Sequence, residues 1–193
     1  MVDYAIHPGQ CALLIYDMTD ELIDPSSPGY SAWVAEKLAT LKRLIGACHR
    51  SKIPVYYALP QSSVDKRGID KAADAICDLI KPGPEDTIII RPKSGAFLDS
   101  PLEALLRQQG RTTLLIGGMA VDRGCNTAAR DAHNRGLKPV IVQDVCFTRD
   151  IEKGSFGFIS KEEIHRAHLA SLERAVAKIA TVEELIEAFV LGD

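Results

Sequence analysis

Short apolar runs alternate along the chain with longer segments in which apolar residues recur at helical spacing, and this alternation limits the fold more than any other feature. The run CALLIY over 11–16 is apolar from end to end, and the later runs are equally unbroken. Strands with apolar residues on both faces are typical of a parallel sheet that helices cover on each side. We therefore expect an α/β protein, a doubly wound three-layer α/β/α sandwich around a six-stranded parallel sheet. The strands are predicted over 11–16, 54–59, 87–90, 113–116, 139–142 and 179–180.

The segments between these strands carry the signals of helices. Apolar residues repeat at helical spacing between 30 and 52 and again between 69 and 80. Ser160 and Thr181 each precede a glutamate by three residues, which is the arrangement of a capping box at the start of a helix. The predicted helices cover 30–52, 69–80, 102–110, 126–135 and 160–177, with a last helix after 181.

Length and charge narrow the class of protein. A chain of 193 residues predicts one domain, 1–193. The 23 basic and 26 acidic residues leave no basic surplus to hold a nucleic acid. No apolar run reaches the roughly 18 residues of a membrane helix, and the first ten residues lack the pattern of a signal peptide. The five cysteines include no CxxC pair, which argues against a disulfide framework or a zinc cluster. We expect a cytoplasmic protein with a small-molecule partner and with neither nucleic acid nor membrane as a partner.

Polar residues at the ends of the predicted strands are the candidate site residues, because ligands of doubly wound folds bind beyond the carboxyl ends of the strands. An acid, two bases, a glycine-rich turn and a cysteine are expected to meet at this edge of the sheet. These residues are Asp17, Gln61, Arg91, Lys93, the turn over 117–125 and Asp144.

Asp17 is the candidate for proton transfer. A carboxylate that ends a buried strand is partly desolvated, so its pKa can be tuned for acid–base work; a turn or helix cap is the structural alternative. Arg91 and Lys93 lie two residues apart and point the same way on an extended chain. Either can place a positive charge beside Asp17, and the alternative is a pair of solvated surface cations.

The turn GGMAVDRGC over 117–125 can bind an anion, since its glycines let backbone amides approach a ligand and a helix start follows. It matches neither a dinucleotide nor a P-loop motif. Cys125, near the helix start, is either an acidified thiol or an ordinary buried cysteine. His165 and His168 share a predicted helix face without a metal motif around them. We expect no metal and no cofactor.

Four segments in this order, DMTDEL, RPKSGAF, GMAVDRGC and TAARDA, resemble the motifs of the isochorismatase-like hydrolase superfamily. The resemblance extends over nearly the whole chain and implies the family's Rossmann-like sandwich. It also implies a small-molecule hydrolase that forms a homodimer or homotetramer. Amidases of this superfamily use an Asp–Lys–Cys triad, in which Asp17 matches the aspartate and Arg91 the lysine, while Lys93 is the alternative if the loop is reshaped.

The residue at position 124 distinguishes the amidases of this family, which use a covalent nucleophile, from the isochorismatases, which do not. Counting from both flanking motifs places Gly124 where the amidases have their nucleophile, with Cys125 one residue beyond. Isochorismatases resemble this chain in having a Gly-Cys pair there. In them the aspartate that Asp17 matches protonates the vinyl ether of the substrate, and no covalent nucleophile is needed. Nicotinamidases bind a metal through residues that include histidines after the second strand, and YALPQSSVDKRGID has no histidine.

The resemblance also implies details of the glycine-rich turn. A cis peptide bond is expected between Ala120 and Val121, and the amides of Val121 and Gly124 are expected to form an oxyanion hole. Gln61, Phe97 and Ala120 complete the residues that we expect to contact the substrate.

Three hypotheses remain open from the sequence. The first is a hydrolase that uses acid–base chemistry at Asp17, with Arg91 or Lys93 supplying positive charge. The second is a cysteine amidase that uses Cys125, which needs a shifted turn because one helical residue rotates a side chain by about 100°. The third is a catalytically silent member that binds a metabolite.

Overall fold

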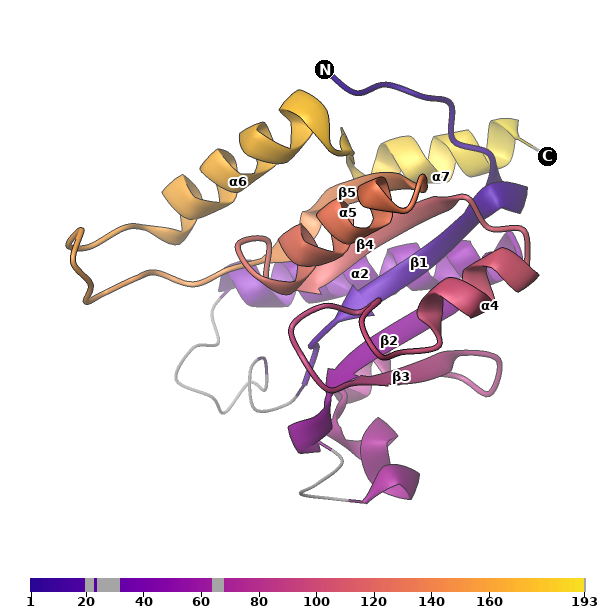
Figure 1. Cartoon of the computed structure of the whole chain (residues 1–193), viewed down its shortest axis with the longest axis horizontal. Helices are drawn as coiled ribbons and strands as arrows, with labels where there is room; N and C mark the ends of the chain where they lie inside the picture. Colours follow the sequence, from indigo (N-terminus) through magenta and orange to yellow (C-terminus); the bar gives the residue numbers. More distant parts are fainter. Residues whose placement is uncertain (20–22, 24–31, 64–67, 193) are drawn as a thin grey trace.

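Six strands form one parallel sheet in the computed structural model, which describes residues 1–19, 23, 32–63 and 68–192 (Figure 1). The sheet has the order β3-β2-β1-β4-β5-β6, and each neighbouring pair is parallel. The predicted doubly wound sheet is therefore confirmed. The strands are β1 (Cys11–Tyr16), β2 (Val55–Pro60), β3 (Thr87–Arg91), β4 (Thr113–Met119), β5 (Lys138–Phe147) and β6 (Lys178–Ala180).

Helices cover both faces of this sheet. The first face packs against α2 (Ala32–Arg50) and α7 (Val182–Leu191), and the second against α4 (Leu102–Gln108), α5 (Gly124–Asn134) and α6 (Lys161–Ala175). Successive side chains of β1 alternate between the two cores, as the pleat of a strand requires. In the part of the chain that the structure describes, no helix combines the length and apolar character needed to cross a membrane.

The order of the strands creates a switch point between β1 and β4. The chain moves outward from β1 to β2 and β3, then crosses back to lay β4 on the other side of β1. Tyr16 pairs with Gly118 at this boundary, so Asp17 emerges beside the turn that follows β4. Open α/β sheets bind their ligands at such a point, outside the carboxyl ends of the strands.

The predicted helix over 69–80 is wrong. Ile69–Ala75 and Asp78–Ile80 form separate 3-10 turns. Ile76, between them, is extended and forms an antiparallel bridge with Thr19. Pairing with the segment after β1 interrupts the helix, and the apolar spacing of 69–80 carries no information about that distant partner.

β5 is longer than predicted and takes Asp144 away from the site. Asp144 lies within the strand, and its two carboxylate oxygens accept hydrogen bonds from the Val182 amide at 3.1 and 3.0 Å. It therefore holds the start of α7, where it complements the unpaired amides of a helix N-terminus. The capping boxes predicted at Ser160 and Thr181 are both present.

Candidate active site

A small cavity lies where β1 and β4 end. Its volume is about 90 Å³, which is room for about three water molecules, so it suits one small group of a ligand. One acid and two guanidinium groups border it, a set that favours a carboxylate or another small anion. The lining residues are Asp17, Met119, Ala120, Arg123 and Arg149.

Asp17 occupies the cavity wall in an uncommon backbone conformation. Its φ of +46° lies in the left-handed region, which residues other than glycine rarely adopt and which clusters at functional sites. The side chain is 20% exposed. Oδ2 pairs with the Arg91 guanidinium, whereas Oδ1 is buried and has no hydrogen-bond partner among the described residues. Burial raises the pKa of this carboxyl above its usual value, against the lowering effects of Arg91 and then Arg123.

Arg91, and not Lys93, supplies the charge beside Asp17. The Arg91 side chain is 9% exposed and forms the ion pair with Asp17. Its Nη1 also donates to the Lys93 carbonyl at 2.6 Å. Lys93 itself is exposed. Of the two cations that the sequence left open, the structure brings only Arg91 to the acid.

The ring of Tyr16 fills the place above Gly124. A Cβ atom at position 124 would overlap this ring, and one at Gly118, where φ is +109°, would overlap the Tyr16 backbone. The position that resembles the amidase nucleophile therefore has no room for a side chain. Sequence reasoning missed Tyr16, although an aromatic residue directly before Asp17 and glycines at both 118 and 124 were the available signal.

Cys125 is fully buried, and its thiol donates to the Gly118 carbonyl at 3.5 Å. Burial raises the pKa of Cys125 well above its usual value, and the neighbouring Cys146 raises it further. A nucleophilic cysteine needs the opposite shift, because the thiolate is the reactive form. The environment of Cys125 thus argues against the amidase hypothesis.

The turn after β4 differs from the expected one in two respects. The cis peptide bond joins Met119 to Ala120, one residue earlier than predicted and directly after the last β4 residue that pairs with β5. The Val121 amide donates to the Phe147 carbonyl at 2.8 Å. The predicted role of this amide in an oxyanion hole is wrong, since its hydrogen is already engaged with β5.

Two other predicted contact residues lie away from the cavity. Phe97 is 5% exposed and belongs to the core beneath α4 and α5, where the Arg135 guanidinium stacks on its ring at 4.9 Å. This packing makes Phe97 a core residue and corrects its predicted role. Gln61 is exposed on the turn after β2 and is not among the residues that line the cavity. Ala120 does line it.

Arg149 is a site residue that sequence reasoning missed, and Arg123 lies in the candidate turn over 117–125 but its side chain was not singled out. Arg123 precedes α5, and Arg149 follows β5. The Thr148 hydroxyl donates to Asp122 at 2.6 Å, which ties the two segments together. Their positions after strands β4 and β5 were the only available signal, because neither arginine belongs to a periodic pattern.

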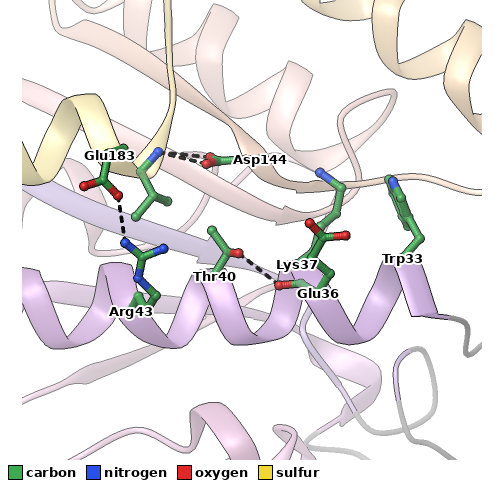
Figure 2. Close-up of a pocket in the computed structure, with 8 residues that line it drawn as sticks. Trp33, Glu36, Lys37, Thr40, Arg43, Asp144 and Glu183 are labelled. Atoms are coloured by element: carbon green, nitrogen blue, oxygen red, sulfur yellow. Dashed lines mark hydrogen bonds and ion pairs between the residues drawn. The ribbon is translucent and has the colours of Figure 1, made fainter.

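A second, larger cavity of about 280 Å³ lies between α2 and the start of α7 (Figure 2). Several of its charges are engaged within the fold: Arg43 pairs with Glu183 at 2.7 Å, and Lys37 donates to the Gln143 carbonyl at 3.2 Å. Asp144 binds the α7 start, as described above. Across the described ranges, no cluster of three or more His, Cys, Asp or Glu side chains could hold a metal ion.

Comparison with known protein families identifies the family of this chain. Residues 11–184 match the family described as the isochorismatase domain. The chain belongs to the isochorismatase family. This confirms the family that four sequence segments predicted, and with it the family's sandwich fold.

Curated relatives agree with this assignment, and a solved structure shows the same fold. Enterobactin synthase component B of Escherichia coli K12 is 33% identical over 175 residues, which are 82% of this chain and 61% of that protein. The isochorismatase of Bacillus subtilis is 27% identical over 165 residues, 79% of this chain and 53% of that protein. The isochorismatase-family chain thus spans about three fifths of the first relative and half of the second. A cysteine hydrolase from Pseudomonas syringae pv. phaseolicola has a TM-score of 0.88 at 20% identity, covering 100% of this chain and 98% of its own.

Replacing Gly124 by alanine should destabilise the protein. Alanine normally favours a helix over glycine, but here the new methyl group overlaps the Tyr16 ring, so we expect a loss of about 1–3 kcal/mol in the free energy of unfolding. Urea denaturation measures it. Gly9→Ala is the control, because a Cβ there meets nothing within 4 Å. Equal stability of Gly124→Ala and the parent would contradict the close packing.

Cys125 should resist alkylation in the folded protein. It is fully buried and its pKa is raised, so iodoacetamide at neutral pH should modify it only after denaturation. Peptide mass spectrometry of native and urea-treated samples measures the difference. Modification of Cys125 at the same rate in both samples would reinstate the amidase hypothesis.

Proposed function

We propose that this protein is a hydrolase that cleaves the vinyl ether bond of a small carboxylate-bearing molecule, with Asp17 as the general acid. The observation that carries the proposal is the Asp17 carboxyl, which burial shifts toward its protonated form at the wall of a cavity that Arg123 and Arg149 also line. Similarity to the isochorismatase of Bacillus subtilis supports the reaction class.

The proton begins on the Asp17 carboxyl, and the surroundings of Oδ1 favour the protonated form. This oxygen is buried without a hydrogen-bond partner in the described part of the chain, and an unpartnered carboxylate oxygen in a low-dielectric site favours the protonated form. Asp17 gives this proton to the terminal carbon of the vinyl group, and the adjacent carbon becomes an oxocarbenium ion. Water adds to that carbon and returns a proton to Asp17. The hemiketal then breaks its C–O bond to release an alcohol and a ketone.

Positive charge serves two purposes in this scheme. Arg91 stays paired with Oδ2 of Asp17 and holds the carboxyl in place. Arg123 and Arg149 bind the carboxylate of the substrate, because guanidinium groups match carboxylate geometry.

A covalent intermediate has no place in this scheme. Gly124 carries no side chain and lies under the Tyr16 ring, and the Cys125 thiol is buried with a raised pKa. Water is therefore the nucleophile, and proton transfer to carbon is the step that the enzyme accelerates.

The proposed setting is the cytoplasm, with the protein as a homodimer or homotetramer and without a metal or cofactor. Buried cysteines that form no disulfide support a reducing compartment, among them Cys11, Cys48, Cys125 and Cys146.

Asp17→Asn should remove activity, with isochorismate and simpler enolpyruvyl ethers as the probes. Asparagine preserves the shape but cannot deliver the proton, so kcat/KM should fall by about 100-fold or more. The parent's kcat/KM should decrease as pH rises through the Asp17 pKa, because only the protonated carboxyl is a donor. Cys125→Ala is the matched control and should retain turnover. Full activity in Asp17→Asn, or loss of activity in Cys125→Ala with ureido amides as the better substrates, would overturn the proposal.

Arg123→Gln should weaken substrate binding. Loss of one charged hydrogen bond should raise KM for a carboxylate substrate by roughly 10-fold to 100-fold, while its methyl ester should show little change. Steady-state kinetics on the acid and the ester measure this. Arg130→Gln, on the exposed side of α5, is the control. Equal KM changes for acid and ester would show that Arg123 does not bind the carboxylate.

A further inference from the structure

Tyr16 does not line the cavity, yet it directly precedes Asp17 and contacts the end of β4, the start of α5 and the loop after β3. The side chain is completely buried at the end of β1. Its ring faces Gly124 at the start of α5, its backbone faces Gly118 in β4, and its hydroxyl donates to the Ser94 carbonyl in the loop after β3. One residue thus connects the end of β1 with β4, the start of α5 and the loop after β3.

The Arg91 guanidinium lies over the face of this ring, 4.7 Å from its centroid. The negative face of an aromatic ring attracts a cation, and more strongly in a desolvated site. Three partners therefore hold Arg91: the Tyr16 ring, the Lys93 carbonyl and the Asp17 carboxylate. The Lys93 carbonyl accepts from Nη1, whereas the acid pairs with Nη2, so the two groups hold different nitrogens of the guanidinium.

We propose that Tyr16 is a positioning residue, whose buried ring and hydroxyl hold the Arg91 guanidinium against the Asp17 carboxylate. The inference rests on the role proposed for Asp17 above. It adds that Tyr16 controls the ionisation of the acid through Arg91, without touching the substrate.

The charges around Asp17 predict in which direction its pKa should change when Arg91 is held less firmly. Arg91 from β3 and Arg123 before α5 both lower the pKa of Asp17, in opposition to burial. Arg149 after β5 faces the same cavity. Near the Tyr16 ring lie Cys125 and Asp131 of α5. Of these groups only Arg91 contacts the ring as a cation, so loosening it should raise the Asp17 pKa further.

The test is an NMR titration of the Asp17 carboxyl carbon in the full-length protein, which requires no substrate. Tyr16→Leu removes the ring face and the hydroxyl, and should raise the pKa of Asp17 by about one unit. Tyr16→Phe keeps the ring and should shift it by less than half as much. The Arg91 guanidinium signals should also show faster rotation in Tyr16→Leu than in Tyr16→Phe.

Tyr56→Leu is the matched control. Tyr56 is buried in the same core and on the adjacent strand, but its hydroxyl lies near Arg111 instead of Arg91. It should lower thermal stability without moving the Asp17 pKa. An unchanged Asp17 pKa in folded Tyr16→Leu, or an equal shift in Tyr56→Leu, would overturn the proposal.

Fluorinated phenylalanines at position 16 keep the test decisive if Tyr16→Leu does not fold. Stepwise fluorination weakens the negative ring face while nearly preserving its shape. The Asp17 pKa should rise along the series from phenylalanine to pentafluorophenylalanine, and a flat series would refute the proposal. The two proposals can fail separately. If Asp17→Asn stays active, Asp17 is not the general acid. If the fluorinated series still shifts the Asp17 pKa in that case, Tyr16 positions Arg91 in a site that performs a different reaction.

Discussion

The contact between Tyr16 and the glycines at 118 and 124 is the constraint on which the site depends. β1 and β4 are neighbours at the switch point, where the Tyr16 backbone lies against Gly118 of β4 and the Tyr16 ring against Gly124 at the start of α5, and neither position has room for a side chain. Close packing leaves no slack for a methyl group at either glycine. The Tyr16–Gly124 contact sets the distance between Asp17 and the turn that carries Arg123.

A buried ion pair occupies the centre of this arrangement. Desolvation of two charges offsets much of their attraction, so such a pair contributes little net stability. The ion pair matters for the protonation of Asp17, because burial raises the pKa of this carboxyl and Arg91 lowers it. A small change in the position of one guanidinium therefore changes the protonation of the acid. The same balance explains why an arginine, which stays charged at neutral pH, suits a position where the amidases of the superfamily have lysine.

A shift of one residue separates Gly124 from Cys125 and gives them opposite environments. Gly124 faces Tyr16, whereas Cys125 points into the core beside Cys146. Adjacent helical residues differ by about 100° in direction, so the thiol cannot serve the position that its neighbour occupies. Cys125 lies next to the position that resembles the amidase nucleophile and packs as a small apolar residue.

The amino-acid sequence alone determined the features that depend on neighbouring residues: the buried strands, the starts of two helices and the polar residues at strand ends. Unbroken apolar runs predicted the buried parallel strands, glutamates three residues after Ser160 and Thr181 predicted two helix starts, and strand ends predicted that Arg91 or Lys93 lies beside Asp17, of which the structure has Arg91. Tertiary structure alone decided the rest. Ile76 is extended and pairs with Thr19 instead of continuing a helix. Asp144 accepts a hydrogen bond from the first amide of α7, and the Val121 amide donates to the Phe147 carbonyl. In each case the deciding hydrogen-bond partner lies many residues away, and only the folded sheet brings it within reach.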